Sequence, residues 1–145
     1  MNSFVFVYPM FAMVLLTCGV LGALFHARVK SVSNGQIEAR YFKIYRGENE
    51  PENLAQLSQH FTNIFEAPTL FYVACLVAMI TDQSTALLIS LAWLYVGLRV
   101  LHAYIHIGSN KLRHRFSVYL GSWIVLATMW GALTFGVIMG GTVAP

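Results

Sequence analysis

The sequence has few charged residues, and this scarcity limits the classes of protein to which it can belong. Of its 145 residues, 10% are charged and 57% are hydrophobic, and the mean hydropathy is +0.63. Soluble domains are about one quarter charged and about half apolar. The composition therefore excludes an ordinary soluble domain and indicates a protein that resides in a lipid bilayer.

Cysteine and the common enzyme motifs are also scarce. The only cysteines are Cys18 and Cys75, which lie at depths that differ by roughly 10 Å when counted along membrane-spanning helices, so we expect no disulfide between them. The chain has no glycine-rich phosphate loop, no nucleophile elbow and no paired CxxC motif. The frequent signatures of soluble enzymes are therefore absent.

Four long apolar stretches make up most of the chain. Each is long enough to cross a hydrocarbon core of about 30 Å as a helix, and they cover residues 4–26, 58–80, 84–107 and 117–143. Because little sequence remains outside them, we expect a single domain over residues 1–145. The predicted fold is all-α, an integral membrane bundle of four helices.

Basic residues are concentrated in the two longer loops, between spans one and two and between spans three and four: Arg28, Lys30, Arg40, Lys43, Arg46, Lys111, Arg113 and Arg115. The positive-inside rule places both of these loops in the cytoplasm and both termini on the opposite side. Basic residues beside a membrane orient the protein and attract anionic lipid headgroups. We therefore expect contacts with membrane lipid and none with nucleic acid.

The third span contains a polar stripe that begins with an arginine. Arg99, His102, His106 and Asn110 follow one another at helical spacing, so they share one face of the predicted helix. An arginine at membrane depth is costly unless it faces protein or water. It therefore marks a functional site, and its partner must be sought elsewhere in the chain.

The second span provides a matching polar stripe, which consists of Gln59, Asn63 and Glu66. Glu66 and Arg99 both lie about 21 Å from the short turn that joins spans two and three, at a rise of 1.5 Å per residue. Either charge would cost several kcal/mol if it were unpaired in lipid. The sequence therefore predicts an ion pair between Glu66 and Arg99.

These facing stripes have three interpretations. We favour a site for an amphiphile, with an anionic head near the arginines and an apolar tail in the lipid. A second possibility is a buried polar network that only fixes the register of the helices. A third is a metal bound by His102, His106 and Glu66. We rank the metal below the amphiphile because a second cation beside Arg99 would be repelled.

Two motifs resemble a known family. NIFEAPTLFY at residues 63–72, and the spaced polar residues of LRVLHAYIHIGSNKLRHR at residues 98–115, are similar to the MAPEG family, the membrane-associated proteins in eicosanoid and glutathione metabolism, and to its bacterial branch above all. The resemblance implies a homotrimer with sites between protomers near the cytoplasmic face. It also implies glutathione as co-substrate and a bacterial inner membrane, with both termini in the periplasm.

The resemblance also implies roles for individual residues. Arg115, or Arg113 if the register differs, corresponds to the arginine that stabilises the glutathione thiolate, because a guanidinium beside a thiol favours its charged form. His106 stands where many members have a tyrosine and is the third expected catalytic residue. The residues expected to bind glutathione are Asn63, Glu66, Arg99, His102, Arg28 and Gln59.

The sequence departs from the family at helix two, where glutathione-using animal members carry arginines and this chain has Gln59 and Thr62. The resemblance implies a glutathione transferase or peroxidase that acts on hydrophobic electrophiles. The alternative, which the loss of these arginines favours, is a non-catalytic membrane protein that binds a lipid or another hydrophobic ligand.

Overall fold

The computed structural model describes residues 3–44 and 50–141, and the regular secondary structure in this part of the chain consists of helices joined by turns and loops. A short 3-10 turn, Ser3–Phe6, leads into α1 (Val7–Ser33), and α2 is one turn long (Tyr41–Ile44). The other long helices are α3 (Glu52–Ile80), α4 (Ala86–Ile107) and α5 (Leu112–Gly141). All four long helices are apolar and long enough to cross a membrane. The chain is therefore an all-α, multi-pass membrane protein; the last two residues of the predicted fourth span lie outside the described ranges.

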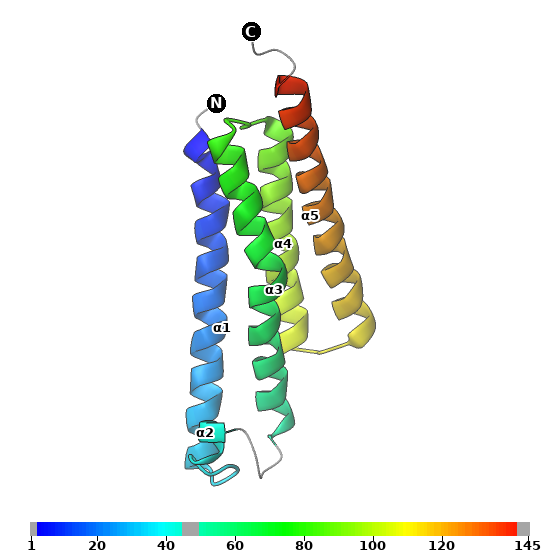
Figure 1. Ribbon diagram of the computed structural model, residues 1–145. Helices are drawn as coiled ribbons and strands as arrows, with labels where there is room; N and C mark the ends of the chain where they lie inside the picture. Colours follow the sequence, from blue (N-terminus) through cyan, green and yellow to red (C-terminus); the bar gives the residue numbers. More distant parts are fainter. Residues whose placement is uncertain (1–2, 45–49, 142–145) are drawn as a thin grey trace.

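Short polar turns join α3, α4 and α5. The hydroxyl of Thr85 caps α4 by accepting a hydrogen bond from the Leu88 amide at 3.3 Å. Asp82 and Asn110 have φ values of 54° and 46°, a left-handed conformation that Asp and Asn adopt more readily than most residues. These turns reverse the chain twice, so that α4 runs antiparallel to both α3 and α5 (Figure 1).

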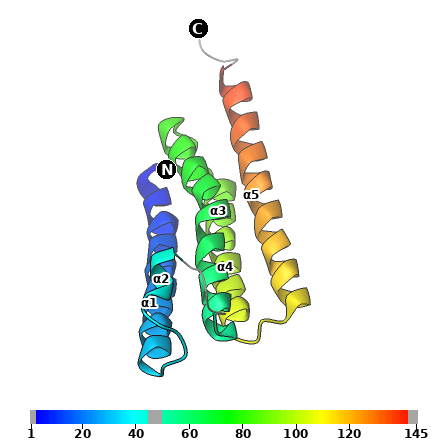
Figure 2. The same cartoon turned by 60° about the horizontal axis from the view of Figure 1, so that its bottom comes forward.

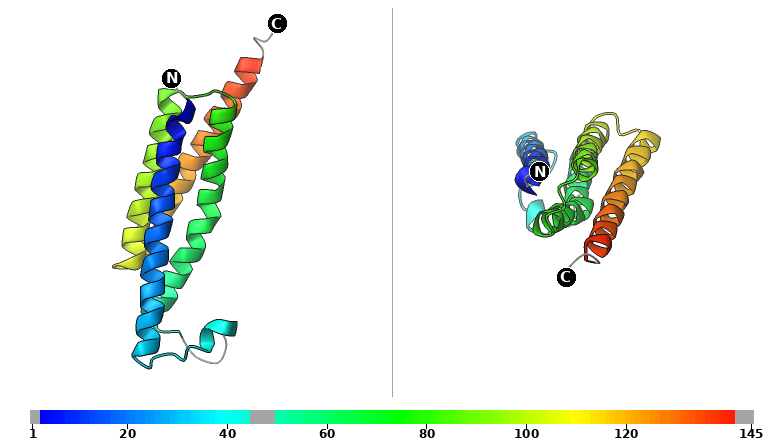
Figure 3. Two further views of the ribbon diagram at one scale, coloured as in Figure 1. Left: turned by 90° about the vertical axis from the view of Figure 1, so that its left-hand side faces the viewer. Right: turned by 90° about the horizontal axis from the view of Figure 1, so that it is seen from above.

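The four helices form an open bundle. α1 packs mainly against α3, and α4 packs mainly against α5, while α3 also contacts α4 and α5. Within the described residues α1 and α5 do not touch. Seen from above, they lie on opposite sides of the α3–α4 pair (Figure 3), and the turned view in Figure 2 shows α5 at the outer edge.

Two apolar clusters fill the bundle, and a polar layer separates them. The larger cluster lies toward the α3–α4 turn and includes Phe71 stacked on Tyr95, with ring centroids 4.5 Å apart. The smaller one lies at the opposite end, where Ile37 and Tyr41 pack against α1 and α3. The buried polar residues between the clusters are His60, Arg99, His102 and His106. This layer is where the functional site must be sought.

Candidate functional site

A pocket of about 270 Å³ opens beside the polar layer, between α3, α4 and α5. It is lined by Asn63, His102, Leu112, Arg115, Phe116 and Tyr119. The turn after α4 returns the chain along that helix, and Arg115 and Tyr119 lie four residues apart on one face of α5. Cationic, amide, imidazole and phenol groups therefore meet beside an apolar wall.

Arg115 is held in this pocket by the turn that precedes α5. Its Nη1 donates to the side-chain oxygen of Asn110 at 2.8 Å, and the left-handed backbone at Asn110 positions that oxygen. The side chain is half-buried, so its charge is only partly screened by water. Such a fixed guanidinium can stabilise an anion in the pocket.

His102 and Tyr119 form a second pair of functional groups in the pocket. Their ring centroids lie 5.6 Å apart, and His102 is only 2% exposed. Its Nδ1 is buried and has no hydrogen-bond partner among the residues that the structure describes. An unsatisfied buried polar atom is costly, so this nitrogen would gain stability from a hydrogen bond.

Arg99 lies behind the pocket, and the predicted ion pair with Glu66 is wrong. Arg99 is 1% exposed, and its Nη2 donates to the backbone carbonyl oxygen of Asn63 at 3.1 Å. Glu66 is exposed, and no ion pair joins it to Arg99 in the described part of the chain. The depths match, but the Glu66 side chain lies on the exposed surface of α3, and the guanidinium of Arg99 binds the backbone of that helix instead.

His106 pairs with a residue that the sequence analysis did not select. Its Nδ1 lies 2.9 Å from the Nδ1 of His60, at hydrogen-bond distance, and both side chains are 1% exposed. The side-chain amide of Gln56 also donates to the backbone carbonyl oxygen of His106. His60 was identifiable, because it lies three residues after Leu57 and four before Ile64, on the apolar stripe of α3 rather than on its polar one.

The predicted site residues are distributed over three environments. Asn63, His102 and Arg115 line the pocket, whereas Arg99 and His106 lie buried behind it. Gln59, Glu66 and Arg113 are exposed and do not line it. Arg28 is also outside: it packs over the Phe42 ring on α2 at 5.4 Å and lies beside a different pocket.

Three residues that line the pocket were not predicted from the sequence: Leu112, Phe116 and Tyr119. Tyr119 follows Arg115 by one helical turn, and this spacing could have identified it. As for metal sites, the described residues contain no group of three or more His, Cys, Asp or Glu side chains that could hold an ion.

Comparison with known proteins identifies the family of the chain. The model of the MAPEG family matches residues 6–135, which is most of the chain and includes all four long helices in large part. No curated protein and no solved structure matches the chain significantly.

Proposed function

This chain belongs to the MAPEG family, and on that premise we propose that it is a membrane enzyme that activates glutathione in the Arg115 pocket. The proposed reaction is transfer of glutathione to a hydrophobic electrophile. The observation that supports it is Arg115, which is held by Asn110 beside His102 and Tyr119. The guanidinium of Arg115 therefore lies next to the neutral side chains of His102 and Tyr119 in the pocket.

The proposed role of Arg115 is electrostatic. A guanidinium beside a thiol lowers the pKa of that thiol, because it stabilises the thiolate over the neutral form. The thiolate is the nucleophilic form. Arg115 would therefore raise the fraction of reactive glutathione at neutral pH, and the half-buried setting makes its charge more effective than it would be in water.

The proposed reaction releases one proton and one leaving group. The thiol proton passes to water, the thiolate sulfur forms a bond to carbon, and the leaving group departs with its bonding electrons. Reduction of a lipid hydroperoxide at the same site would consume two glutathione molecules and yield an alcohol, water and glutathione disulfide. The apolar side chains of Leu112 and Phe116 suit the hydrophobic partner.

The other polar groups suit the peptide part of glutathione. Asn63 offers an amide, and the unpartnered Nδ1 of His102 offers a donor or an acceptor. We assign to Tyr119, rather than to His106, the role of the tyrosine that many family members carry. Tyr119 lines the pocket, whereas His106 lies at hydrogen-bond distance from His60. Among the described residues that line the pocket, Arg115 is the one cation. It fits the thiolate and leaves the two carboxylates of glutathione without a cation.

We further propose that the site is completed in a homotrimer. Pockets for drug-sized ligands usually measure about 300–1,000 Å³, whereas this pocket has about 270 Å³. Glu66 is exposed on a membrane-spanning helix, where an uncovered carboxylate would be costly. A neighbouring protomer that covers Glu66 would remove this cost, and it could bring Arg28 of one copy toward the pocket of another.

The orientation that we propose follows from the distribution of charge. The basic loops before and after the α3–α4 hairpin would face the cytoplasm, with both termini in the periplasm of a bacterial inner membrane. The Arg115 pocket lies at the end of α4 near the second of these loops. Water-soluble glutathione would therefore enter from the cytoplasm.

A second candidate function is supported by the exposed face of α3. Gln59 and Thr62 carry no charge and are exposed, so the carboxylates of glutathione have no cation there. A non-catalytic protein that holds a lipid or a hydrophobic ligand would need none. Binding of glutathione distinguishes the two functions, since only the enzyme requires it.

The enzymatic proposal is tested with purified protein, glutathione and a chromogenic aryl chloride. We expect turnover above the uncatalysed rate, and loss of most of it in Arg115→Ala. Lys111→Gln, which removes an exposed charge outside the pocket, is the matched control and should retain wild-type turnover. If neither electrophiles nor hydroperoxides are turned over by the wild type, the enzymatic proposal is wrong and the binding protein is favoured.

A further inference from the structure

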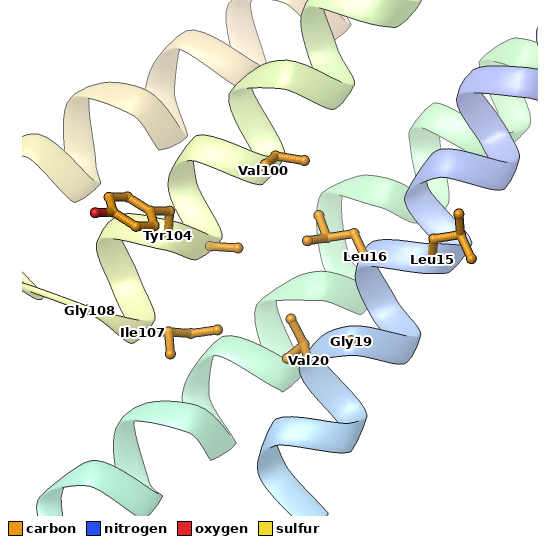
Figure 4. A pocket seen from close by; sticks show the side chains of 9 residues that line it. Leu15, Leu16, Gly19, Val20, Val100, Tyr104, Ile107 and Gly108 are labelled. Carbon is orange, nitrogen blue, oxygen red and sulfur yellow. The ribbon is translucent and has the colours of Figure 1, made fainter.

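A second concave surface lies between α1 and α4, away from the Arg115 pocket. Figure 4 shows Leu16 and Val20 on α1 across from Val100 and Ile107 on α4, with Leu15 further along the rim of the groove. The groove has a volume of about 530 Å³, and apart from Tyr104 its lining consists of aliphatic side chains and the glycines Gly19 and Gly108. It is therefore an apolar groove on a membrane-spanning surface.

The groove and the Arg115 pocket are on different sides of α4. Tyr104 lines the groove and His102 lines the pocket. Two residues along an α-helix correspond to a rotation of about 200°. A ligand in the groove would therefore be separate from one bound beside Arg115.

A polar pocket of about 430 Å³ lies further along the same side of α1. Its polar lining comes from α1, from the loop that follows α1 and from the start of α3: His26, Lys30, Ser31, Asn34, Gln36 and Asn53. Among the described residues that line it, none is acidic. The pocket therefore offers a cation and several neutral hydrogen-bonding groups, which together suit an anion.

The spacing of residues on α1 connects the groove to this polar pocket. Leu16, Gly19, Ala23, Ala27 and Lys30 recur every three or four residues, so they form one stripe along the helix. Gly19 and Lys30 are separated by about 16 Å at 1.5 Å per residue. The groove is closed on one side by α4, which ends at Ile107, and the polar pocket begins beyond that end.

We propose that the groove and the polar pocket together bind one anionic membrane phospholipid. One acyl chain lies in the groove between α1 and α4, and the phosphate lies against Lys30 and His26. Charge complementarity identifies the occupant, because an apolar groove that ends in a cationic pocket matches an anionic amphiphile. Lipid tails are as apolar as the groove, so the tail adds little selectivity and the headgroup determines it.

The proposal is tested by photo-crosslinking in liposomes of phosphatidylcholine. Each preparation contains a trace of either phosphatidylglycerol or phosphatidylcholine with a photoactivatable acyl chain, and labelled peptides are mapped by mass spectrometry. We expect phosphatidylglycerol to label the facing segments of α1 and α4 several-fold more than phosphatidylcholine does. Equal labelling by the two lipids would overturn the proposal.

Two pairs of variants separate the headgroup from the tail. Lys30→Gln should lower labelling by phosphatidylglycerol about five-fold, since one basic residue near a membrane surface contributes about 1 kcal/mol. Lys43→Gln removes an exposed charge outside the pocket and should have no effect. Gly19→Leu should block labelling by filling the groove, whereas Gly22→Leu should not; at both glycines the space beside the backbone is open. Equal effects within either pair would contradict the proposal.

A second copy of the chain is the competing occupant of the groove. Tyr104 lies at the edge of the groove and is 78% exposed. A disulfide formed by Tyr104→Cys in a Cys18→Ser background therefore reports whether a second copy of the chain lies at the groove. If the phospholipid occupies the groove, oxidation should leave the protein without crosslinks between copies at this position. Efficient crosslinking together with loss of lipid labelling would show a protein occupant and refute the proposal.

Discussion

Replacing Arg115 with glutamine removes the cation from the proposed thiolate site but keeps a polar side chain of similar length. If the guanidinium stabilises the thiolate, Arg115→Gln raises the pKa of the bound thiol. The rate should rise with pH as the thiol ionises, and the variant should need a higher pH than the wild type. The defect should therefore be largest at low pH and should vanish where the thiol is ionised in both proteins.

The size of the effect follows from the half-buried position of Arg115. Two unit charges about 4 Å apart interact by about 1 kcal/mol in water and about 4 kcal/mol near a protein surface. One pKa unit corresponds to about 1.4 kcal/mol, so the thiol pKa should change by about one to three units from a free value of about 8.5. At neutral pH this predicts a loss of about 10- to 30-fold in kcat/KM.

The assay is the pH dependence of kcat/KM for an aryl chloride, measured at equal concentrations of folded protein. Arg113→Gln tests the alternative register, because Arg113 is exposed and does not line the pocket, and we expect its profile to match that of the wild type. A uniform loss at every pH in Arg115→Gln would indicate damage to the structure rather than loss of thiolate stabilisation. A shifted profile in Arg113→Gln alone would reassign the role.

Three further predictions concern stability and assembly. His60→Ala should lower the free energy of unfolding by about 1–3 kcal/mol, because it leaves a buried nitrogen without its partner, whereas the exposed neighbour variant Gln59→Ala should leave thermal unfolding in detergent unchanged. Gly136→Ala should be less stable than Gly131→Ala by about 1 kcal/mol, since the added methyl group displaces the Gln83 side chain and removes its hydrogen bond to the Leu133 carbonyl oxygen; equal melting temperatures would refute this. Glu66→Leu should reduce the trimeric fraction in native mass spectrometry, whereas an intact and more stable oligomer would show that Glu66 faces lipid.

The fold class was predictable because hydropathy directly reflects the bilayer. Four apolar stretches without room for a soluble domain specify four membrane helices, and the MAPEG motifs identify the family that the match over residues 6–135 confirms. The helix ends were less predictable: α3 begins at Glu52, six residues before the predicted span. Polar first turns extend a helix beyond the hydrocarbon core into the membrane–water interface. They add no apolar residues, so the length of the apolar stretch does not reveal where such a helix begins.

The face of each helix that lines the candidate site followed from residue spacing, whereas the contacts between helices did not. Asn63, His102 and Arg115 converge on one pocket, but the partners of Arg99 and His106 were not found. Depth along a helix follows from counting residues, whereas the rotation of one helix against its neighbour depends on packing. Arg99 therefore meets a backbone carbonyl of α3 rather than Glu66, and His106 meets His60 from the apolar stripe.

The most direct test of the proposed function is the affinity of the purified protein for glutathione, measured by isothermal titration calorimetry. We expect micromolar binding to the wild type and markedly weaker binding to Arg115→Gln, with Lys111→Gln unchanged. Absent or only millimolar binding to the wild type would contradict the proposed function, and would leave the Arg115 pocket as a site for a different ligand.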